Sequence, residues 1–397
     1  MSDTRSLWDI ISSCLLTLFA CTYVSVHPNV PSPNASQLTV FLTRIKLMIL
    51  ALVAPEILLA WAARQSYVAH TIQKGQLLYL TTKHSNSHLK KEFKIPKQHA
   101  FFLTMGGFVG QIREGKTYPL HKPDIVRLGL ESTLRRVPEK EISSRSKADH
   151  ISKAIAVLQL LWFIIQCIAR KIQHLPTTSL ELVTIAFGGI SGVMYCVWWD
   201  KPMAVECPIV LTKDLGSPLF LSWTTAMRQE DTLRDPGVLV PNAIWETVFY
   251  PRIRPRQSDS RVPHLWPGGT SLGDGDEGAA LLLIFTSVIF GGIHCLGWNF
   301  YYPTTAEALI WQVCSVLITG GPVLVTLFFI VVLVIDEEFY DTMPYTDQVV
   351  TFLGMFFVGA RLILLILPFV LLRDLPSAAF DTVSWTRFIP HVSSGIQ

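Results

Sequence analysis

The sequence is poor in charge and in cysteine. Only 16% of its 397 residues are charged, against about 25% in a soluble globular chain, and 50% are hydrophobic. That balance excludes a disordered chain, an acidic or basic tail protein and an ordinary cytosolic enzyme. The seven cysteines include no CxxC pair, which excludes a zinc ribbon and a dense disulfide framework. A net charge of +3 is too small to indicate a nucleic-acid partner, and the chain has no P-loop, GxGxxG motif or internal repeat.

Long apolar runs are what the sequence does contain. A bilayer core is crossed by roughly 20 apolar helical residues, and seven segments reach or nearly reach that length. We therefore predict an all-α fold, a polytopic transmembrane helical bundle of about seven spans. The sixth span contains Gly320-Gly321-Pro322, which predicts a kink or a broken helix. The predicted spans are Ser6–His27, Leu47–Ala63, Ile151–Ile168, Leu180–Trp199, Gly278–Phe300, Ala306–Ile335 and Val349–Leu372.

The basic residues predict the orientation of these spans. The connection 64–150 holds 16 of the 33 lysines and arginines, and the connection 200–277 holds eight more. Basic connections stay on the cytosolic side, so the N-terminus is expected to be cytosolic and the loop with the sequon at Asn34 lumenal. The predicted parts are helices one and two (1–63), a basic cytosolic segment (64–150), helices three and four (151–199), a cytosolic segment with a Pro/Gly/Arg-rich linker (200–277), helices five to seven (278–372) and a C-terminal tail (373–397).

Glu56 is the most unusual polar residue of the predicted spans. It follows Pro55 near the middle of the second span, where proline removes a backbone donor and breaks the helix. A charge at the bilayer centre costs about 2.5–3.5 kcal/mol, so this carboxyl needs a partner or a function. One interpretation is an ion pair with Arg361, at a similar depth in the seventh span. The other is a neutral acid that donates a proton, because a dry environment raises a carboxyl pKa.

Polar residues also recur along one face of the third span. Gln159, Trp162, Gln166 and Arg170 share a helical face that we expect to look into the bundle. They either form interhelical hydrogen bonds or line a substrate cavity. Glu181 is better explained locally, because Thr178-x-x-Glu181 is a capping box that opens the fourth helix.

Acids gather at the predicted cytosolic rim. They either bind a divalent ion for a diphosphate or neutralise the basic cytosolic segments, and the second explanation is the simpler one. These acids are Asp9, Asp200, Asp336, Glu337, Glu338 and Asp341.

Several phrases of this chain resemble a large group of fungal multi-pass membrane proteins, mostly of unknown function. The resemblance covers nearly the whole chain except residues 250–277. Membrane proteins of this kind occur in secondary-metabolite clusters, where integral-membrane terpene cyclases fold the prenyl chains of meroterpenoids into rings. The Asp-rich NDxxD pattern of intramembrane prenyltransferases is missing here. The phrases are ALVAPEILLAWAARQ (51–65), SRSKADHISKAIAVLQLLWFIIQCIAR (144–170), HLPTTSLELVTIAF (174–187), YCVWWDKPMAVECPI (195–209) and DLPSAAFDTVSWTRFIPHV (374–392).

By that analogy we expect a membrane-bound terpene cyclase or isomerase in the endoplasmic reticulum. Cyclisation needs one strong acid and a dry aromatic cavity that stabilises cations. Its substrate would be a prenylated small molecule in the lipid bilayer, with no metal and no cofactor. A non-enzymatic scaffold or sensor is the alternative hypothesis, and a small-molecule transporter a third. The expected acid is Glu56, with Asp9 and Asp200 in reserve, and the expected substrate-binding residues are Gln159, Trp162, Gln166, Arg361 and Trp199.

Overall fold

The computed structural model describes most of the predicted helical regions. Outside its described residues lie the sequon asparagine Asn34, nearly all of the predicted Pro/Gly/Arg-rich linker, the rim acids Asp336, Glu337, Glu338 and Asp341, and residues 386–397 of the tail. The described residues are 4–33, 35–74, 78–80, 89–91, 94–111, 117–121, 124–125, 128–146, 149–211, 262, 265, 268, 276–335 and 346–385.

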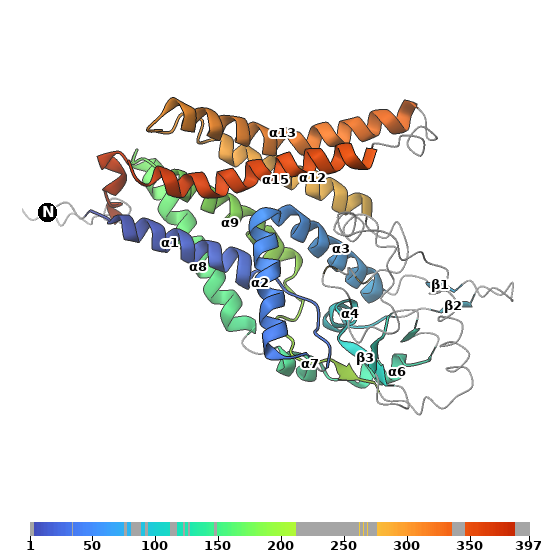
Figure 1. Cartoon of the computed structure of the whole chain (residues 1–397). Helices are drawn as coiled ribbons and strands as arrows, with labels where there is room; N and C mark the ends of the chain where they lie inside the picture. The colour runs from blue at the N-terminus through green and yellow to red at the C-terminus, as the bar shows by residue number, and fades with distance from the viewer. Residues whose placement is uncertain are drawn as a thin grey trace, which may run out of the picture. The chain divides into compact units, whose positions relative to one another are not determined.

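The described chain is mainly helical, with a few very short strands (Figure 1). The helical prediction is confirmed in this coarse form, and the strands are an addition to it. The helices are α1 (Leu7–Phe19), continued by a π-helical turn (Ala20–Val24), α2 (Gln37–Val53), α3 (Pro55–Lys74), α4 (Lys97–Thr104), α6 (Glu131–Arg136), α7 (Glu139–Arg145), α8 (Asp149–Ile172), α9 (Ser179–Val197), α12 (Asp276–Cys295), α13 (Thr305–Ile335) and α15 (Thr346–Leu371), followed by a 3₁₀ turn (Ser377–Phe380). The strands are β1 (Leu78–Leu80), β2 (Leu89–Lys91), β3 (Phe108–Gln111), β4 (Thr117–Pro119) and β5 (Ile209–Val210).

Five of these helices are long and apolar enough to cross a membrane. They correspond to the predicted spans one, three, four, six and seven. In α12, the helix of span five, only the shorter stretch Leu281–Cys295 is apolar. α13 is one continuous helix through Pro322, so of the two expectations there the broken helix is wrong, and the kink stays a prediction. The candidate spans are Leu7–Val24, Ile151–Ile172, Ser179–Val197, Thr305–Leu327 and Phe352–Leu371.

The predicted second span is not a straight helix. α2 ends at Val53, α3 begins at Pro55, and the two axes meet at a bend of 113°. Pro55 has no N–H and its ring clashes with the preceding turn, so a new helix starts there. The predicted helix break is therefore confirmed. The pair is either one broken span or a re-entrant loop.

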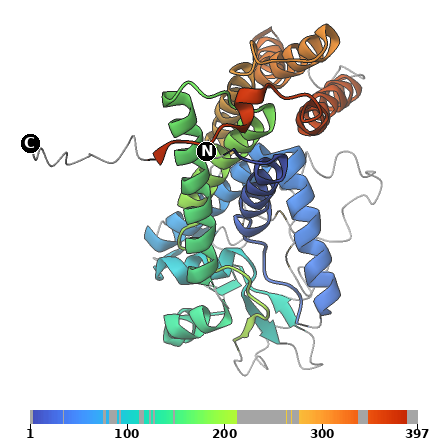
Figure 2. The same ribbon diagram turned by 90° about the vertical axis from the view of Figure 1, so that its left-hand side faces the viewer.

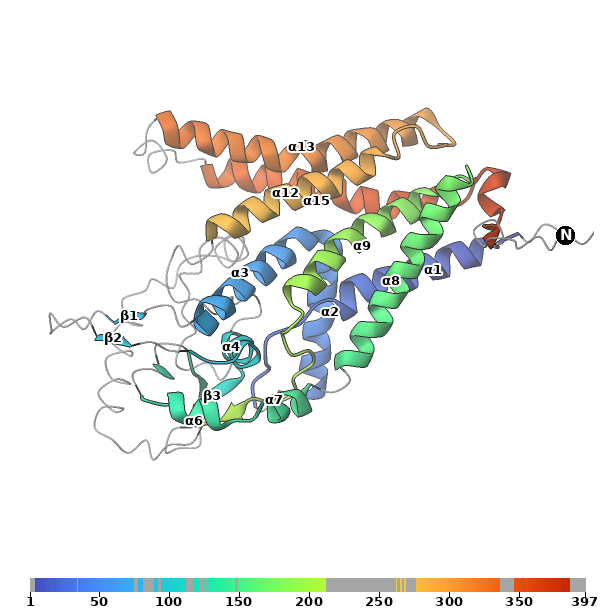
Figure 3. The same cartoon turned by 180° about the vertical axis from the view of Figure 1, so that it is seen from behind.

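The chain divides into two compact units. Unit 1 comprises Met1–Cys21, Ile155–Gly189 and Ser287–Gln397, and unit 2 comprises Thr22–Ala154 and Ile190–Thr286. In unit 1, α13 packs along α15, and α12 lies beside α13 (Figure 3). Its apolar core is built by α1, α8 and the start of α9. The core residues are Ile10, Cys14, Phe163, Cys167, Leu180 and Leu372.

Unit 2 contains the bent pair, the short helices and the strands. The short helices and strands of residues 97–145 lie together, coloured cyan and teal in Figure 2. β3 pairs antiparallel with β4 and parallel with β5, with Val109 opposite Pro119 and Val210. The apolar segment 101–109 forms the end of α4 and the start of β3, with Phe101, Phe102 and Phe108 buried.

The outer faces of the long helices are apolar. Only 28% of the α8 span and 22% of the α13 span are buried, and their exposed residues include Leu158 and Leu309. Water would not tolerate so much contiguous apolar surface, whereas lipid does. These helices are therefore those of a membrane protein.

Candidate functional site

The three acids predicted as proton donors do not form one site. Asp9 lies in unit 1, where it caps α1 by accepting hydrogen bonds from the N–H and the hydroxyl of Ser6. Asp200 lies in unit 2, and its carboxylate is 2.7 Å from the ammonium of Lys97. Both reserve acids therefore have structural partners.

Glu56 lies in the first turn of α3 in unit 2 and is only 2% exposed. Arg361 belongs to unit 1, and the predicted Glu56–Arg361 ion pair stays a prediction.

The predicted substrate residues are scattered as well. Gln159 donates a hydrogen bond to the hydroxyl of Thr17, as expected for interhelical bonding. Trp162 is 49% exposed and stacks on Trp385, so the expectation that its whole helical face looks inward is wrong. Gln166 is partly buried, and Trp199 is 64% exposed.

Arg361 is buried against two aromatic rings of unit 1. Its guanidinium lies 4.1 Å from the centre of the Phe290 ring and 5.2 Å from that of Phe357. Together with His294 it borders a small void of about 10 Å³, too small for a substrate. Its observed contacts are therefore those of cation–π packing.

A buried polar cluster in unit 2 was missed by the sequence analysis. The ammonium of Lys201 donates hydrogen bonds to the carbonyl of His27 and, over 2.7 Å, to the side chain of Gln65. It also lies 4.6 Å and 4.2 Å from the ring centres of Trp61 and Trp198. Burial, helped by the charge of Lys153, lowers the pKa of Lys201 well below its usual value. The two indole faces act the other way and stabilise the ammonium.

His27 completes this cluster with a neutral imidazole. Its ring packs edge-on to Trp198, 5.4 Å between centres, and neither ring nitrogen has a hydrogen-bond partner among the described residues. Burial first, and then the charges of Lys153, Lys201 and Arg44, lower the pKa of His27 well below 6.5. The cluster joins residues from three distant parts of the sequence, but neither described cavity opens at Lys201 or His27.

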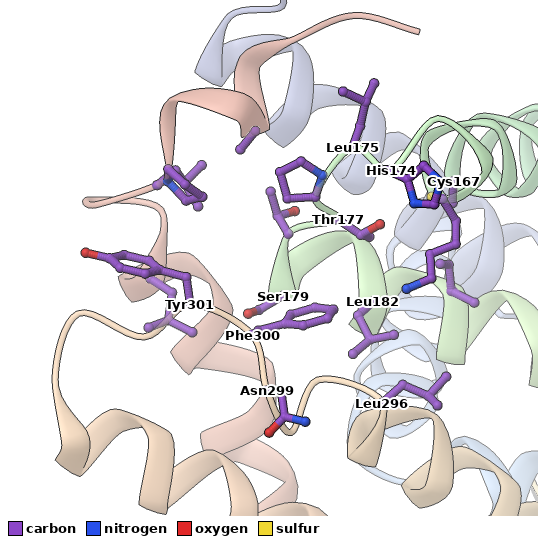
Figure 4. Close-up of a pocket in the computed structure, with 18 of the residues that line it drawn as sticks. Cys167, His174, Leu175, Thr177, Ser179, Leu182, Leu296, Asn299, Phe300 and Tyr301 are labelled. Atoms are coloured by element: carbon purple, nitrogen blue, oxygen red, sulfur yellow. The ribbon is translucent and has the colours of Figure 1, made fainter.

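The larger of the two described cavities lies in unit 1 (Figure 4). Its volume is about 640 Å³, which falls in the usual range of roughly 300–1,000 Å³ for small-molecule sites. The end of α8, the start of α9, the α12–α13 connection and the chain after α15 surround it. Apolar side chains dominate the wall, including Ile164, Leu182, Ile185, Leu296, Phe300 and Leu371.

A few polar groups border this pocket. Lys171 and His174 are its basic residues, and Asn299, Tyr301 and the hydroxyls of residues 177–179 are the neutral ones. The Tyr301 hydroxyl donates a hydrogen bond to the carboxylate of Asp374, and that bond raises the pKa of Tyr301. None of the eight site residues predicted from the sequence lines the pocket.

Two arginines fix the chain segments around the pocket. Arg5 pairs with Glu181 at 2.5 Å and donates to the carbonyl of Ala379. Arg170, almost fully buried, donates to the carbonyls of Pro176, Ala379 and Asp381. Glu181 also accepts hydrogen bonds from Thr178, which confirms the predicted capping box. The segment after α15 is thereby bound to α1, α8 and α9.

The pattern of long apolar helices defines the chain as an integral membrane protein. A family model described as a family of unknown function (DUF8562) matches residues 1–235 and 279–392. The match covers most of the chain, so the protein belongs to this family. No curated protein matches the chain. No solved structure matches it either.

The sequence carried only weak signals for these features. Lys201 lies within the phrase WWDKP and His27 at the end of the first predicted span, but nothing local shows that they meet. A basic residue at a helix end, such as Lys171, reads as ordinary snorkelling. The pocket depends on contacts between segments far apart in the sequence, which no local pattern encodes.

Proposed function

We propose that this protein is a membrane-embedded enzyme of fungal secondary metabolism that binds a prenylated small molecule in the pocket of unit 1. The observation that supports this most is the pocket itself, large enough for a drug-sized ligand and walled mainly by aliphatic and aromatic side chains. An isoprenoid chain dissolves in such a site and gains about 25 cal/mol for each Å² of apolar surface buried. An endoplasmic reticulum membrane with the N-terminus in the cytosol is the proposed setting.

Photo-crosslinking tests this binding directly. Membranes containing the full chain are labelled with a farnesyl probe that carries a diazirine. We expect label on residues 164–182 or 296–301, and its loss in Leu182→Trp and Leu296→Trp, which fill the pocket. Leu309→Trp on an exposed face of α13 is the matched control and should label normally. Equal labelling of all four proteins would contradict the proposal.

Cyclisation by protonation, with Glu56 as the acid, is the proposed reaction. The burial of this carboxyl at a helix break supports it, since a carboxyl shielded from bulk water can act on an alkene or epoxide without water quenching the resulting cation. Glu56 does not line the pocket of unit 1, so the reaction at Glu56 and the binding in the pocket are two separate proposals, each with its own test.

Activity in yeast microsomes supplied with prenylated phenols tests the reaction. We expect Glu56→Gln to lower turnover at least 100-fold, the usual scale for a lost general acid. The matched control is Glu139→Gln, which changes an exposed glutamate in the first turn of α7 and should keep full activity. Conversion that persists in Glu56→Gln would remove Glu56 from the chemistry. No conversion by the wild type would favour the alternative of a scaffold, a sensor or a transporter.

A further inference from the structure

We propose that the ligand of the unit 1 pocket carries an anionic head group, such as a phosphate, and that Lys171 and His174 bind it. The inference rests on the proposed function, because it names the class of molecule that enters the same pocket. It starts from the distribution of charge around that pocket.

The pocket wall has basic residues and no acidic ones. Lys171 and His174 are its basic residues, and none of its described lining residues is an aspartate or a glutamate. Both side chains are exposed at the end of α8, and neither forms a hydrogen bond or ion pair with another described residue. Their donors are therefore available to a ligand, and a ligand anion would gain charge-assisted hydrogen bonds.

The neighbouring cations show that this availability is selective. Arg5 is already paired with Glu181, and Arg170 is already bound to three backbone carbonyls. Arg170 and Lys171 are consecutive, yet Arg170 binds backbone carbonyls of the protein and Lys171 borders the pocket. The arginines are therefore structural, whereas Lys171 is open to a ligand.

The backbone at His174 gives a second, independent observation. The N–H of Leu175 bonds to the carbonyl of Arg170 and the N–H of His174 bonds to that of Lys171, which is the Schellman arrangement at a helix end. His174 occupies its left-handed position with φ of 56°, where glycine is usual. A side chain there costs on the order of 1 kcal/mol. The protein therefore carries an imidazole beside the pocket at a position where glycine would end the helix without strain.

The helix dipole explains only part of this arrangement. Cations at a helix C-terminus are favourable, which accounts for a lysine at position 171. It does not account for a strained histidine at the next turn, because glycine would relieve the strain and leave Lys171 in place. An anionic head group at Lys171 and His174, with an apolar chain reaching Leu182 and Leu296, uses both features. The anion is either that of a free prenyl phosphate or the head group of an anionic lipid.

Binding to the full chain in phosphatidylcholine nanodiscs tests the inference. The probes are radiolabelled farnesyl phosphate and farnesol, measured on wild type, His174→Gly, Lys171→Gln and the control Lys140→Gln, which removes an exposed lysine of α7. We expect farnesyl phosphate to bind at least tenfold more tightly than farnesol to the wild type. The preference should fall about tenfold in His174→Gly and in Lys171→Gln, and remain in Lys140→Gln. His174→Gly should unfold at the same or a higher temperature, so a loss of affinity there is not misfolding.

The outcomes separate the inference from the proposed function. Equal affinity for both probes, or no change in either variant, would overturn the anionic head group while leaving a prenyl-binding pocket. Failure of both probes to bind would overturn the proposed function as well. Displacement of farnesyl phosphate by nanodiscs containing phosphatidylserine would identify a lipid as the source of the anion, and persistence there would identify a free prenyl phosphate. Both of these results support the inference.

Discussion

Buried cations are the residues that most distinguish this protein from a simple bundle of apolar helices. Lys201 and Arg361 lie over aromatic rings, and Arg170 is bound by backbone carbonyls. A desolvated cation over an aromatic ring gains about 2 kcal/mol, and a hydrogen bond to a charged group about 1.5–3 kcal/mol. The sequence showed these cations but not their partners.

His27 makes a testable contribution to pH dependence. Its folded-state pKa lies below 6.5, so between 6.5 and that lower value the unfolded chain binds a proton that the folded chain does not. Stability therefore falls with falling pH, by up to about 1.4 kcal/mol per pH unit from this one group. We expect His27→Leu to flatten the dependence below pH 6.5, measured as the midpoint of thermal unfolding in detergent between pH 4.5 and 7.5.

The exposed His70 of α3 provides the control for this experiment. His70→Leu should leave the wild-type slope unchanged, because the exposed His70 side chain lacks the burial that sets His27 apart. A wild-type slope retained in His27→Leu would show that His27 does not fold as a neutral buried group.

At the scale of elements, the packing of α12 on α13 depends on one glycine. A Cβ at Gly291 would lie 2.3 Å from the Thr319 hydroxyl and 2.7 Å from the backbone of that residue. Small residues allow membrane helices to approach this closely. We expect Gly291→Ala to destabilise the protein by about 1–3 kcal/mol, since backbone cannot yield as a flexible side chain would.

The adjacent Gly292 offers a matched comparison, because a Cβ there would meet nothing within 4 Å. Gly292→Ala should be neutral or slightly stabilising, since alanine favours helix by about 1 kcal/mol over glycine. Thermal unfolding of both variants in the same detergent measures the difference. Equal effects would mean that helix propensity, not the close approach, controls this region.

The sequence predicted elements better than contacts. The capping box at Thr178 and Glu181 and the helix break at Pro55 follow from local rules, and both are present. The apolar runs located five spans because burial in lipid needs only composition and length. By contrast, His27, Gln65 and Lys201 are brought together by tertiary packing. Trp162 faced outward because the buried stripe of α8 follows Leu160, Phe163 and Cys167 instead.

At the scale of the whole molecule, the bent pair α2–α3 decides the topology. If the five candidate spans and α12 all cross the bilayer, the path of this pair determines on which side of the membrane every later connection lies. If the pair crosses the bilayer, the N-terminus and the basic segment 75–93 share the cytosolic side. If it is re-entrant, that segment emerges in the lumen, against the distribution of lysine and arginine.

An inserted glycosylation acceptor distinguishes these two paths. In an Asn34→Gln background, an acceptor is placed between residues 81 and 88 and, separately, after residue 397. We expect no glycan at the first site and a glycan at the second, read as a mobility shift removed by endoglycosidase. The 16 basic residues of 64–150 are the physical reason, because carrying them into the lumen opposes the rule that holds basic connections in the cytosol. A glycan between 81 and 88 would show that α2–α3 is a re-entrant loop. Glu56, the acid of the proposed cyclisation, would then lie at the turn of that loop rather than on a helix that crosses the bilayer.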